Sequence, residues 1–208
     1  MKKAISILAA AMMLSCTFVS CGSSKDDDKQ EGLVGKWSAT DETLRNSEKE
    51  EAEGEDGLKM TAKSAVVEFT ADGKMSIYEE ADLSESMYID DDAFYYQGQK
   101  IPYVYDEKSL TVGSGVMERV DKSDGSSPYG KYKVDEKENG VVYEYNFESP
   151  GVCKATVSGS GEYTYDEETK TLTTTLDDEE DGPSTVELDG DTLKLTDKEG
   201  TDVYTRVK

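Results

Sequence analysis

The side chains that can do chemistry in this 208-residue chain are of few kinds: 46 acidic residues, 13 tyrosines, three cysteines and no histidine. Without histidine, the chain lacks the general base of Ser-His-Asp and Cys-His catalysis and a common zinc ligand. Close carboxylates are unavoidable at this acid content, so they do not by themselves indicate glycoside hydrolysis, which needs two carboxyls at a set separation around a sugar. The sequence therefore predicts a protein that is not an enzyme, with no catalytic residue and no cofactor.

One acidic run has the spacing of a metal-binding loop. Residues 177–182 (DDEEDG) hold acids at positions 1, 3 and 5 and glycine at position 6, as an EF-hand loop does. Position 12 is Leu188, where that loop needs a bidentate glutamate, and the flanking segments alternate like strands. We therefore interpret the run as a solvated hairpin tip and predict no metal site.

Cys21 stands at the boundary between an apolar run and an acidic one. Two lysines precede residues 4–19, which carry no charge and are mostly apolar, as in a secretory signal peptide. This run is shorter than the ~20 residues that a membrane-spanning helix needs. Polar residues follow the cysteine directly (GSSKDDDK), and the arrangement resembles the signal of bacterial lipoproteins. The resemblance implies a signal peptide at residues 1–20, lipid on Cys21 and a flexible acidic tether at residues 21–32.

Two alternatives to this anchor stay open: Cys16 as the lipid-bearing residue, and an ordinary cleaved signal without lipid. With lipid on Cys21, the protein is exported and attached to the bacterial cell membrane or envelope, and the membrane is its predicted partner. The net charge of −23 argues against nucleic acid, because phosphate binding depends on Lys and Arg that release counterions. A small-molecule or protein partner is not identified by the sequence.

Apolar and polar residues alternate along most of the chain after the tether, and turn residues separate the alternating runs. This pattern is typical of half-buried β-strands. In residues 67–77 all apolar positions are odd, which predicts a hairpin with Phe69 opposite Met75 around a three-residue loop. Residues 41–63, rich in Glu, Lys and Ser, interrupt the pattern; they are either a short helix capped by Asp41 or a loop.

Two tighter hairpins are predicted from a change of parity across a glycine turn. The predicted pairs are Val186 with Leu193 around Asp189-Gly190, and Tyr96 with Ile101 around Gly98-Gln99. Consecutive hairpins of this kind form a meander, which is the connectivity of up-and-down barrels.

Four short motifs occur twice in the same order. The pairs are 34–37 (VGKW) with 129–132 (YGKY), 69–73 (FTADG) with 147–151 (FESPG), 103–107 (YVYDE) with 163–167 (YTYDE), and 116–120 (VMERV) with 203–207 (VYTRV). Residues 122–128, between the copies, are typical of a linker. We therefore predict an all-β protein with two tandem up-and-down barrels, residues 33–121 and residues 129–208. One larger pseudo-symmetric barrel is the alternative.

The repeated motifs resemble the lipocalin-like domains of bacterial lipoproteins: a G-x-W at the first strand, an F-x-x-D-G hairpin and an arginine on a late strand. In lipocalins the tryptophan packs at the closed end of the barrel beneath this arginine. The resemblance implies two barrel-closing pairs, Trp37 with Arg119 beside Gly35, and Tyr132 with Arg206 beside Gly130. The T-D-Y motif of larger lipocalins is absent, so lipid transport is not carried over.

Paired tyrosines are the candidate ligand contacts. Tyr103 with Tyr105, and Tyr163 with Tyr165, alternate on one strand face, where they either line a pocket or fill the core of a small barrel. Cys153 alternates with apolar residues and is expected to be a small buried residue. The predicted function is a lipid-anchored, non-enzymatic binding module of the cell envelope, for a small or apolar ligand in a barrel. The alternative is a structural or protein-interaction lipoprotein with filled barrels and no small ligand.

Overall fold

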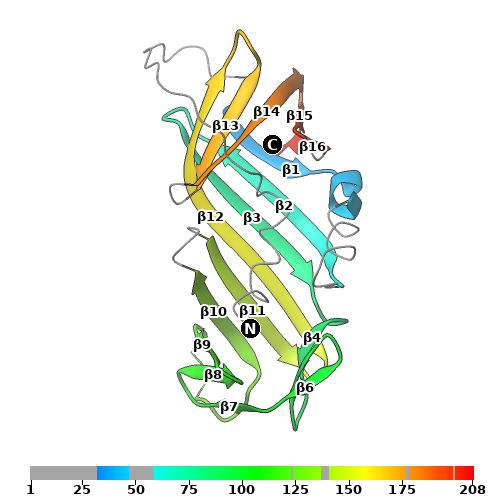
Figure 1. The fold of residues 1–208 in the computed structure, drawn as a ribbon, viewed down its shortest axis with the longest axis vertical. Helices are drawn as coiled ribbons and strands as arrows, with labels where there is room; N and C mark the ends of the chain where they lie inside the picture. The colour runs from blue at the N-terminus through cyan, green and yellow to red at the C-terminus, as the bar shows by residue number, and fades with distance from the viewer. Residues whose placement is uncertain (1–31, 47–58, 123, 137–140, 177–178, 199) are drawn as a thin grey trace.

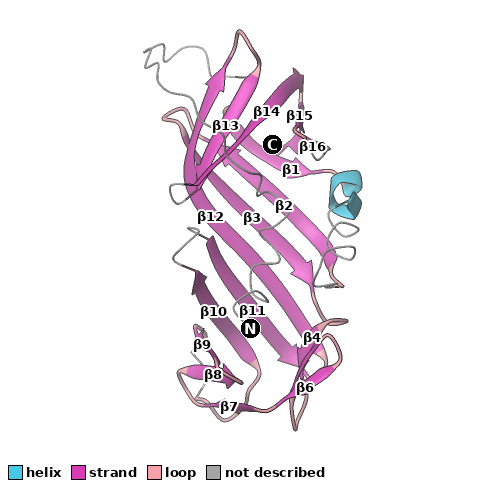
Figure 2. Ribbon diagram, viewed as in Figure 1, coloured by secondary structure: helices cyan, strands magenta, loops and turns pink. Residues whose placement is uncertain are grey.

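The computed structural model describes residues 32–46, 59–122, 124–136, 141–176, 179–198 and 200–208, without the side chains of 135–136 and 179–182. Cys16, Cys21, the signal peptide and the tether up to residue 31 lie outside this part of the chain, as do residues 47–58 of the insertion. The described residues form strands joined by loops and turns, with a helix at residues 41–46 (Figure 2). None of their helices is long and apolar enough to cross a membrane.

The strands are rich in the β-branched and aromatic residues that fit a pleated surface, and they follow the chain in the order of their labels (Figure 1). Their bounds are β1 Gly35–Ala39, β2 Thr61–Phe69, β3 Lys74–Asp82, β4 Met87–Ile89, β5 Phe94–Tyr96, β6 Gln99–Ile101, β7 Tyr103–Tyr105, β8 Ser109–Val112, β9 Gly115–Arg119, β10 Gly130–Glu136, β11 Val141–Ser149, β12 Val152–Asp166, β13 Thr171–Leu176, β14 Glu179–Asp189, β15 Thr192–Thr196 and β16 Thr201–Arg206.

Eight of these strands close into one antiparallel barrel. Its order is β12-β13-β14-β15-β16-β1-β2-β3, and β3 pairs back with β12. Closure gives each of these strands a neighbour on both sides, which removes the free edges of an open sheet. The predicted all-β barrel fold is therefore confirmed.

The long strand β12 joins this barrel to a second sheet. Its first part, up to Gly159, pairs with β11, and its last part, from Gly161, pairs with β13, while β3 runs along its other edge. A Cβ on Gly161 would lie 2.0 Å from the carbonyl oxygen of Thr175, so the change of partner needs glycine. Beyond β11 the sheet continues through β10, β9 and β8 to β7, and the separate sheet β4-β5-β6 lies at the same end (Figure 1).

Each of the two parts has its own packed cluster of buried side chains. The barrel cluster contains Leu33, Trp37, Val67, Phe69, Met75, Ile77, Tyr163, Leu172, Val186, Leu193 and Tyr204. The second cluster contains Ala81, Leu83, Met87, Ile89, Phe94, Leu110, Met117, Tyr132, Val141, Tyr143, Tyr145, Phe147, Cys153, Ala155 and Val157. Both clusters include fully buried aromatic rings, and alternation predicts buried apolar residues on these strand faces.

Two tandem barrels are not what the chain forms, so that prediction is wrong. β9, expected to close the first barrel against β1, pairs with β10, and β16 pairs with β1. Residues 122–128 therefore connect two hydrogen-bonded neighbours. A short connection between adjacent strands costs little loop-closure entropy, and consecutive strands usually pair for this reason.

The repeated motifs nevertheless occupy matching positions. Phe69 pairs with Met75 in one hairpin, and Phe147 pairs with Cys153 in the other. The number of residues from Phe69 to Phe147 equals the number from Met75 to Cys153. The pairing of β3 with β12 brings Glu79 opposite Val157, which are separated by that same number of residues. The two hairpins thus lie around an approximate two-fold axis through this pair. The internal repeat stays a prediction, and the two hairpins that carry its motifs are neighbours through the pairing of β3 with β12.

The predicted hairpins keep their faces, but two of them miss their register. The three-residue loop that ends at Gly73 is confirmed, with Phe69 opposite Met75 and a φ of 78° at the glycine. In the other two hairpins the observed pairs are Val186 with Leu195 and Leu188 with Leu193, and Phe94 with Ile101 and Tyr96 with Gln99. Both are shifted by two residues, a shift that leaves every side chain on its predicted face.

The start of the acidic insertion is a helix, as one of the two interpretations predicted. Its cap is Thr40, because the Thr40 Oγ1 accepts a hydrogen bond from the Thr43 amide at 3.4 Å. Asp41, the predicted cap, is exposed within the first turn. The Thr43 hydroxyl fixes the helix to the last strand by donating to the Val203 carbonyl at 3.1 Å.

Candidate functional site

Trp37 closes one end of the barrel together with Arg206, which lies directly opposite it on β16. The guanidinium carbon lies 4.1 Å from the centre of the indole ring, a cation-π geometry. Arg206 donates from Nη1 to the Val34 carbonyl at 2.8 Å and from Nη2 to the Gly32 carbonyl at 2.7 Å. The indole Nε1 donates to the Leu33 carbonyl at 2.8 Å. These contacts fix the chain where it enters β1.

Tyr132 and Arg119 form the corresponding contact on β10 and β9, with the guanidinium carbon 4.9 Å from the ring centre. Arg119 Nη2 donates to the Ser127 carbonyl at 2.6 Å and to the Tyr129 carbonyl at 3.3 Å. The Tyr132 hydroxyl donates to the Pro128 carbonyl at 2.7 Å. These acceptor residues precede Tyr132 by the same numbers of residues as the acceptors of the first contact precede Trp37. Both aromatic residues are therefore fixed by the same pattern of hydrogen bonds.

The predicted partners are therefore exchanged. Arg206 covers Trp37 and Arg119 covers Tyr132, where the resemblance implied the opposite combination. Gly35 takes a φ of 137°, and a Cβ there would lie 2.5 Å from Arg206 Nη1, so the glycine gives the guanidinium its place. Both rings are fully buried and held by backbone carbonyls, which makes these contacts structural.

The four tyrosines do not share a pocket. Tyr163 is buried in the barrel cluster, with its hydroxyl donating to the Thr70 carbonyl at 2.8 Å and its ring against Phe69. The second tyrosine of that pair, Tyr165, packs against the same cluster. Burial raises the pKa of Tyr163, which keeps its hydroxyl protonated as a donor.

The other tyrosine pair lies on β7, in the second part of the molecule. Tyr103 is half-buried and donates to the Asp90 carbonyl at 3.1 Å, while Tyr105 is 39% exposed. Burial raises the pKa of Tyr103. The two tyrosine pairs therefore serve two different cores and offer no common lining.

Cys153 is buried in the second cluster, as expected of a small apolar residue. Burial raises the pKa of its thiol, so the thiolate that nucleophilic or metal chemistry requires is disfavoured. Its backbone is held by Ser84: the Cys153 amide donates to the Ser84 Oγ at 3.1 Å. Within the described chain, no group of three or more Cys, Asp or Glu side chains could hold a metal ion.

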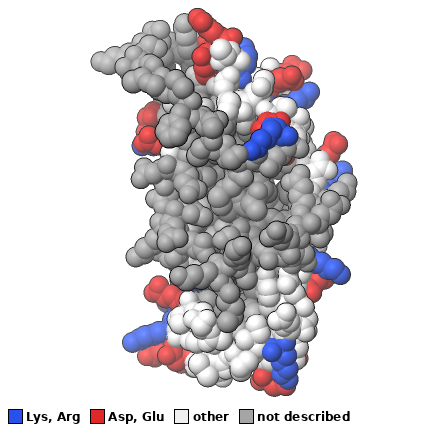
Figure 3. Space-filling model, viewed as in Figure 1, with Lys and Arg blue, Asp and Glu red and all other residues white. Residues whose placement is uncertain are grey.

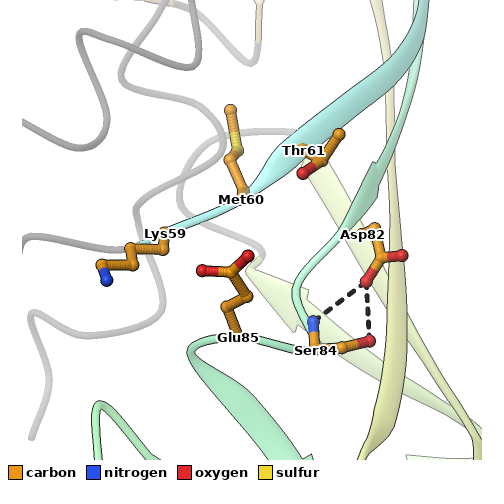
Figure 4. A pocket seen from close by; sticks show the side chains of 6 residues that line it. All are labelled: Lys59, Met60, Thr61, Asp82, Ser84 and Glu85. Atoms are coloured by element: carbon orange, nitrogen blue, oxygen red, sulfur yellow. Dashed lines mark hydrogen bonds between the residues drawn. The ribbon is translucent and has the colours of Figure 1, made fainter.

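A cleft of about 450 Å³ opens where β2 begins and β3 ends. Its lining residues are Lys59, Met60, Thr61, Asp82, Ser84 and Glu85 (Figure 4). Asp82 Oδ1 accepts hydrogen bonds from the Ser84 amide at 3.0 Å and the Ser84 hydroxyl at 2.6 Å. These bonds lower the pKa of Asp82 and keep it ionised. Figure 4 shows the Glu85 carboxylate between Lys59 and Asp82, below Met60.

This cleft combines two carboxylates, one ammonium group and one thioether. It can accept donors from a small polar or cationic molecule and pack a short apolar part against Met60. Within the lining, the Ser84 hydroxyl is held by the Asp82 carboxylate, and the remaining polar groups are placed to bind a small molecule. Sequence reasoning missed it, because the residues come from two strand ends and carry no motif.

Residues 115–195 match the lipocalin-like domain family. No curated protein and no solved structure gives a match. The matched segment runs from β9 to β15 and therefore crosses residues 122–128, which agrees with the pairing of β9 and β10. Residues 115–195 are thus similar to a lipocalin-like domain, and they lie in an all-β barrel structure that is compatible with binding.

Proposed function

We propose that this protein is a non-enzymatic binding protein, exported and lipid-anchored at the cell envelope, that recognises its partner outside the barrel interior. The observation that carries the proposal is the barrel cluster, in which Trp37, Tyr163 and Tyr204 are buried and in contact with the surrounding aliphatic side chains. An eight-stranded barrel is just wide enough for side chains to fill. This favours the alternative predicted from the sequence, an interaction lipoprotein, over an apolar ligand inside a barrel.

Native mass spectrometry of the chain purified from cells tests this part of the proposal. We expect the mass of the chain with its own modifications and nothing else. An apolar molecule that co-purifies at one equivalent and quenches the fluorescence of Trp37 would contradict it, because Trp37 lies inside the barrel.

The anchor on Cys21 is supported by the sequence around it. Replacing Cys21 by Ser should remove the lipid mass and release the protein from membranes, while Cys16→Ser should change neither. Acylation that persists in Cys21→Ser would assign the lipid to another residue. The matching hairpins and end contacts support an internal duplication, which is part of the same proposal.

A second candidate function is the binding of a small cation, favoured by the cleft at the end of β3. Its carboxylates, Asp82 and Glu85, face an open volume of about 450 Å³. Small organic amines, from ethylamine to putrescine, should shift the NMR signal of the Met60 methyl group. Glu85→Gln should weaken this response, and Glu187→Gln, which changes an exposed acid on β14, should not. Shifts that are equal in both variants would exclude the cleft.

A further inference from the structure

Strand β7 is the end of the large sheet. It pairs with β8 on one side and is the last strand in the sheet order, so its other edge has no neighbouring strand among the described residues. An open edge presents backbone donors and acceptors that another extended chain can pair with. The closed barrel has no such edge, so among the described strands open edges are found at β7 and at β4 and β6, the outer strands of the small sheet.

The hydrogen-bond pattern shows which backbone groups of β7 face β8 and which face away from it. The Asp106 amide donates to the Ser109 carbonyl at 3.0 Å, and the Gly113 amide donates to the Pro102 carbonyl at 3.4 Å. Hydrogen-bonded pairs alternate in an antiparallel ladder, so Val104 points its backbone groups toward β8. The amides and carbonyls of Tyr103 and Tyr105 consequently point to the open edge.

An apolar row lies beside this edge on the outer face of β7, β8 and β9. Val104 lies opposite Thr111, and Thr111 lies opposite Val116. Val104 is 67% exposed and Val116 is 64% exposed. In Figure 3 mostly uncharged side chains face the viewer at this end of the molecule, with charged side chains at its corners. A strand added to β7 would extend the same face and cover Val104.

The surroundings of β7 are predominantly acidic. Three acids at residues 90–92 lie close enough to raise the pKa of the Tyr103 phenol, after burial as the main cause. Two more acids, at residues 106–107, follow β7 directly. Of the nearby cations, Lys100 is paired with Asp92, and Lys108 follows the acids at 106–107. A second copy of the chain, also at a net charge of −23, would be repelled.

We propose that β7 docks an extended, basic segment of a partner protein by strand addition, with one apolar residue of that segment against Val104. The backbone edge selects an extended chain, the acids select positive charge, and Val104 selects an apolar contact. This deepens the proposed binding function and rests on it. If docking at β7 is disproved, the proposed function can still hold, because neither the anchor on Cys21 nor the filled barrel depends on β7.

The probe is a ten-residue peptide of alternating lysine and valine, titrated into the full chain and followed by fluorescence anisotropy. The same peptide with an N-methyl group on every residue keeps its charge but has no amide donors, and a glutamate-valine peptide reverses the charge. We expect binding of the first peptide only. Hydrogen exchange at the Tyr103 and Tyr105 amides should slow at least about tenfold in the complex, while the Val104 amide is protected throughout.

Val104→Lys tests the apolar contact, and Val207→Lys is its control. Val207 is a 44% exposed valine at the end of the barrel chain, so both variants add the same charge. Val104→Lys should weaken binding about tenfold more than the control does. The proposal would be overturned if both variants lost the same affinity, or if the N-methylated peptide bound as tightly as the unmodified one. Either result would mean that binding depends on charge attraction alone. Slow exchange at Tyr103 and Tyr105 in the free chain would overturn it too, because the edge would already be covered.

Discussion

The exchanged end contacts can be tested with a double-mutant cycle on Trp37 and Arg206. Arg206→Met removes two charge-assisted hydrogen bonds to carbonyls and the contact with the indole. Each such hydrogen bond is worth about 1.5–3 kcal/mol when buried, and Arg206 is half-buried, so we expect a loss of about 2–3 kcal/mol in the free energy of unfolding. Trp37→Leu should cost about 3 kcal/mol, the lower end for loss of a large buried ring.

The informative quantity is the coupling energy. The ring and the guanidinium are 4.1 Å apart and the ring is fully buried, so the pair should couple by about 1 kcal/mol. Trp37 belongs to the barrel cluster, whereas Arg119 lies over Tyr132 of the second cluster, and distant sites add within about 0.3–0.5 kcal/mol. The same cycle on Trp37 and Arg119 should therefore give no coupling beyond that limit.

Urea unfolding followed by far-UV circular dichroism is the suitable assay, because Trp37 is the sole tryptophan of the chain and guanidinium would screen a net charge of −23. Coupling of Trp37 to Arg119 in place of Arg206 would restore two consecutive barrels and refute the arrangement described above. Additivity in both cycles would refute the stabilising role of the contact.

Three further outcomes are expected. Gly161→Ala should destabilise the chain by about 2 kcal/mol or more in urea, because its methyl group meets the Thr175 carbonyl, while Gly200→Ala, whose added Cβ meets no atom, should cost less. Cys153 should react with a thiol reagent only at the rate of unfolding, since it is buried; fast labelling in native buffer would contradict this. Burial and the neighbouring Asp91 raise the pKa of Tyr129 to about 12. The contribution of Tyr129 to stability is therefore complete below about pH 10 and is lost as the pH rises toward 12. In an ultraviolet titration, Tyr129→Phe should show one late-titrating phenol fewer than the parent protein.

The sequence predicted strand faces better than strand partners. Alternation decides which side chains turn inward, and a shift of two residues preserves it, so the hairpins at Gly98 and Gly190 kept their faces and lost their predicted pairs. Local turn geometry settles such a choice: Gln97 and Gly98 both take positive φ, which places the loop one residue earlier than predicted. The hairpin at Gly73 succeeded because its three-residue loop has a single place for glycine.

The end contacts were predicted in kind but not in combination. The motifs identified two aromatic residues and two arginines, but motif order alone does not say whether a late strand returns to the start of its own repeat. β9 pairs with β10, the next strand in sequence, so Arg119 contacts Tyr132 across a short loop. The cleft beside Glu85 was beyond reach of the sequence, because two strand ends create it without a motif.

The position of β16 has a consequence for damaged chains. A molecule cut before Thr201 lacks the strand that lies between β15 and β1, and it loses Arg206 with it. Such a molecule has two unpaired strand edges, at β15 and at β1, in place of a closed barrel. Unpaired edges make it prone to proteolysis and to aggregation. Closure of the barrel therefore depends on the few residues of β16.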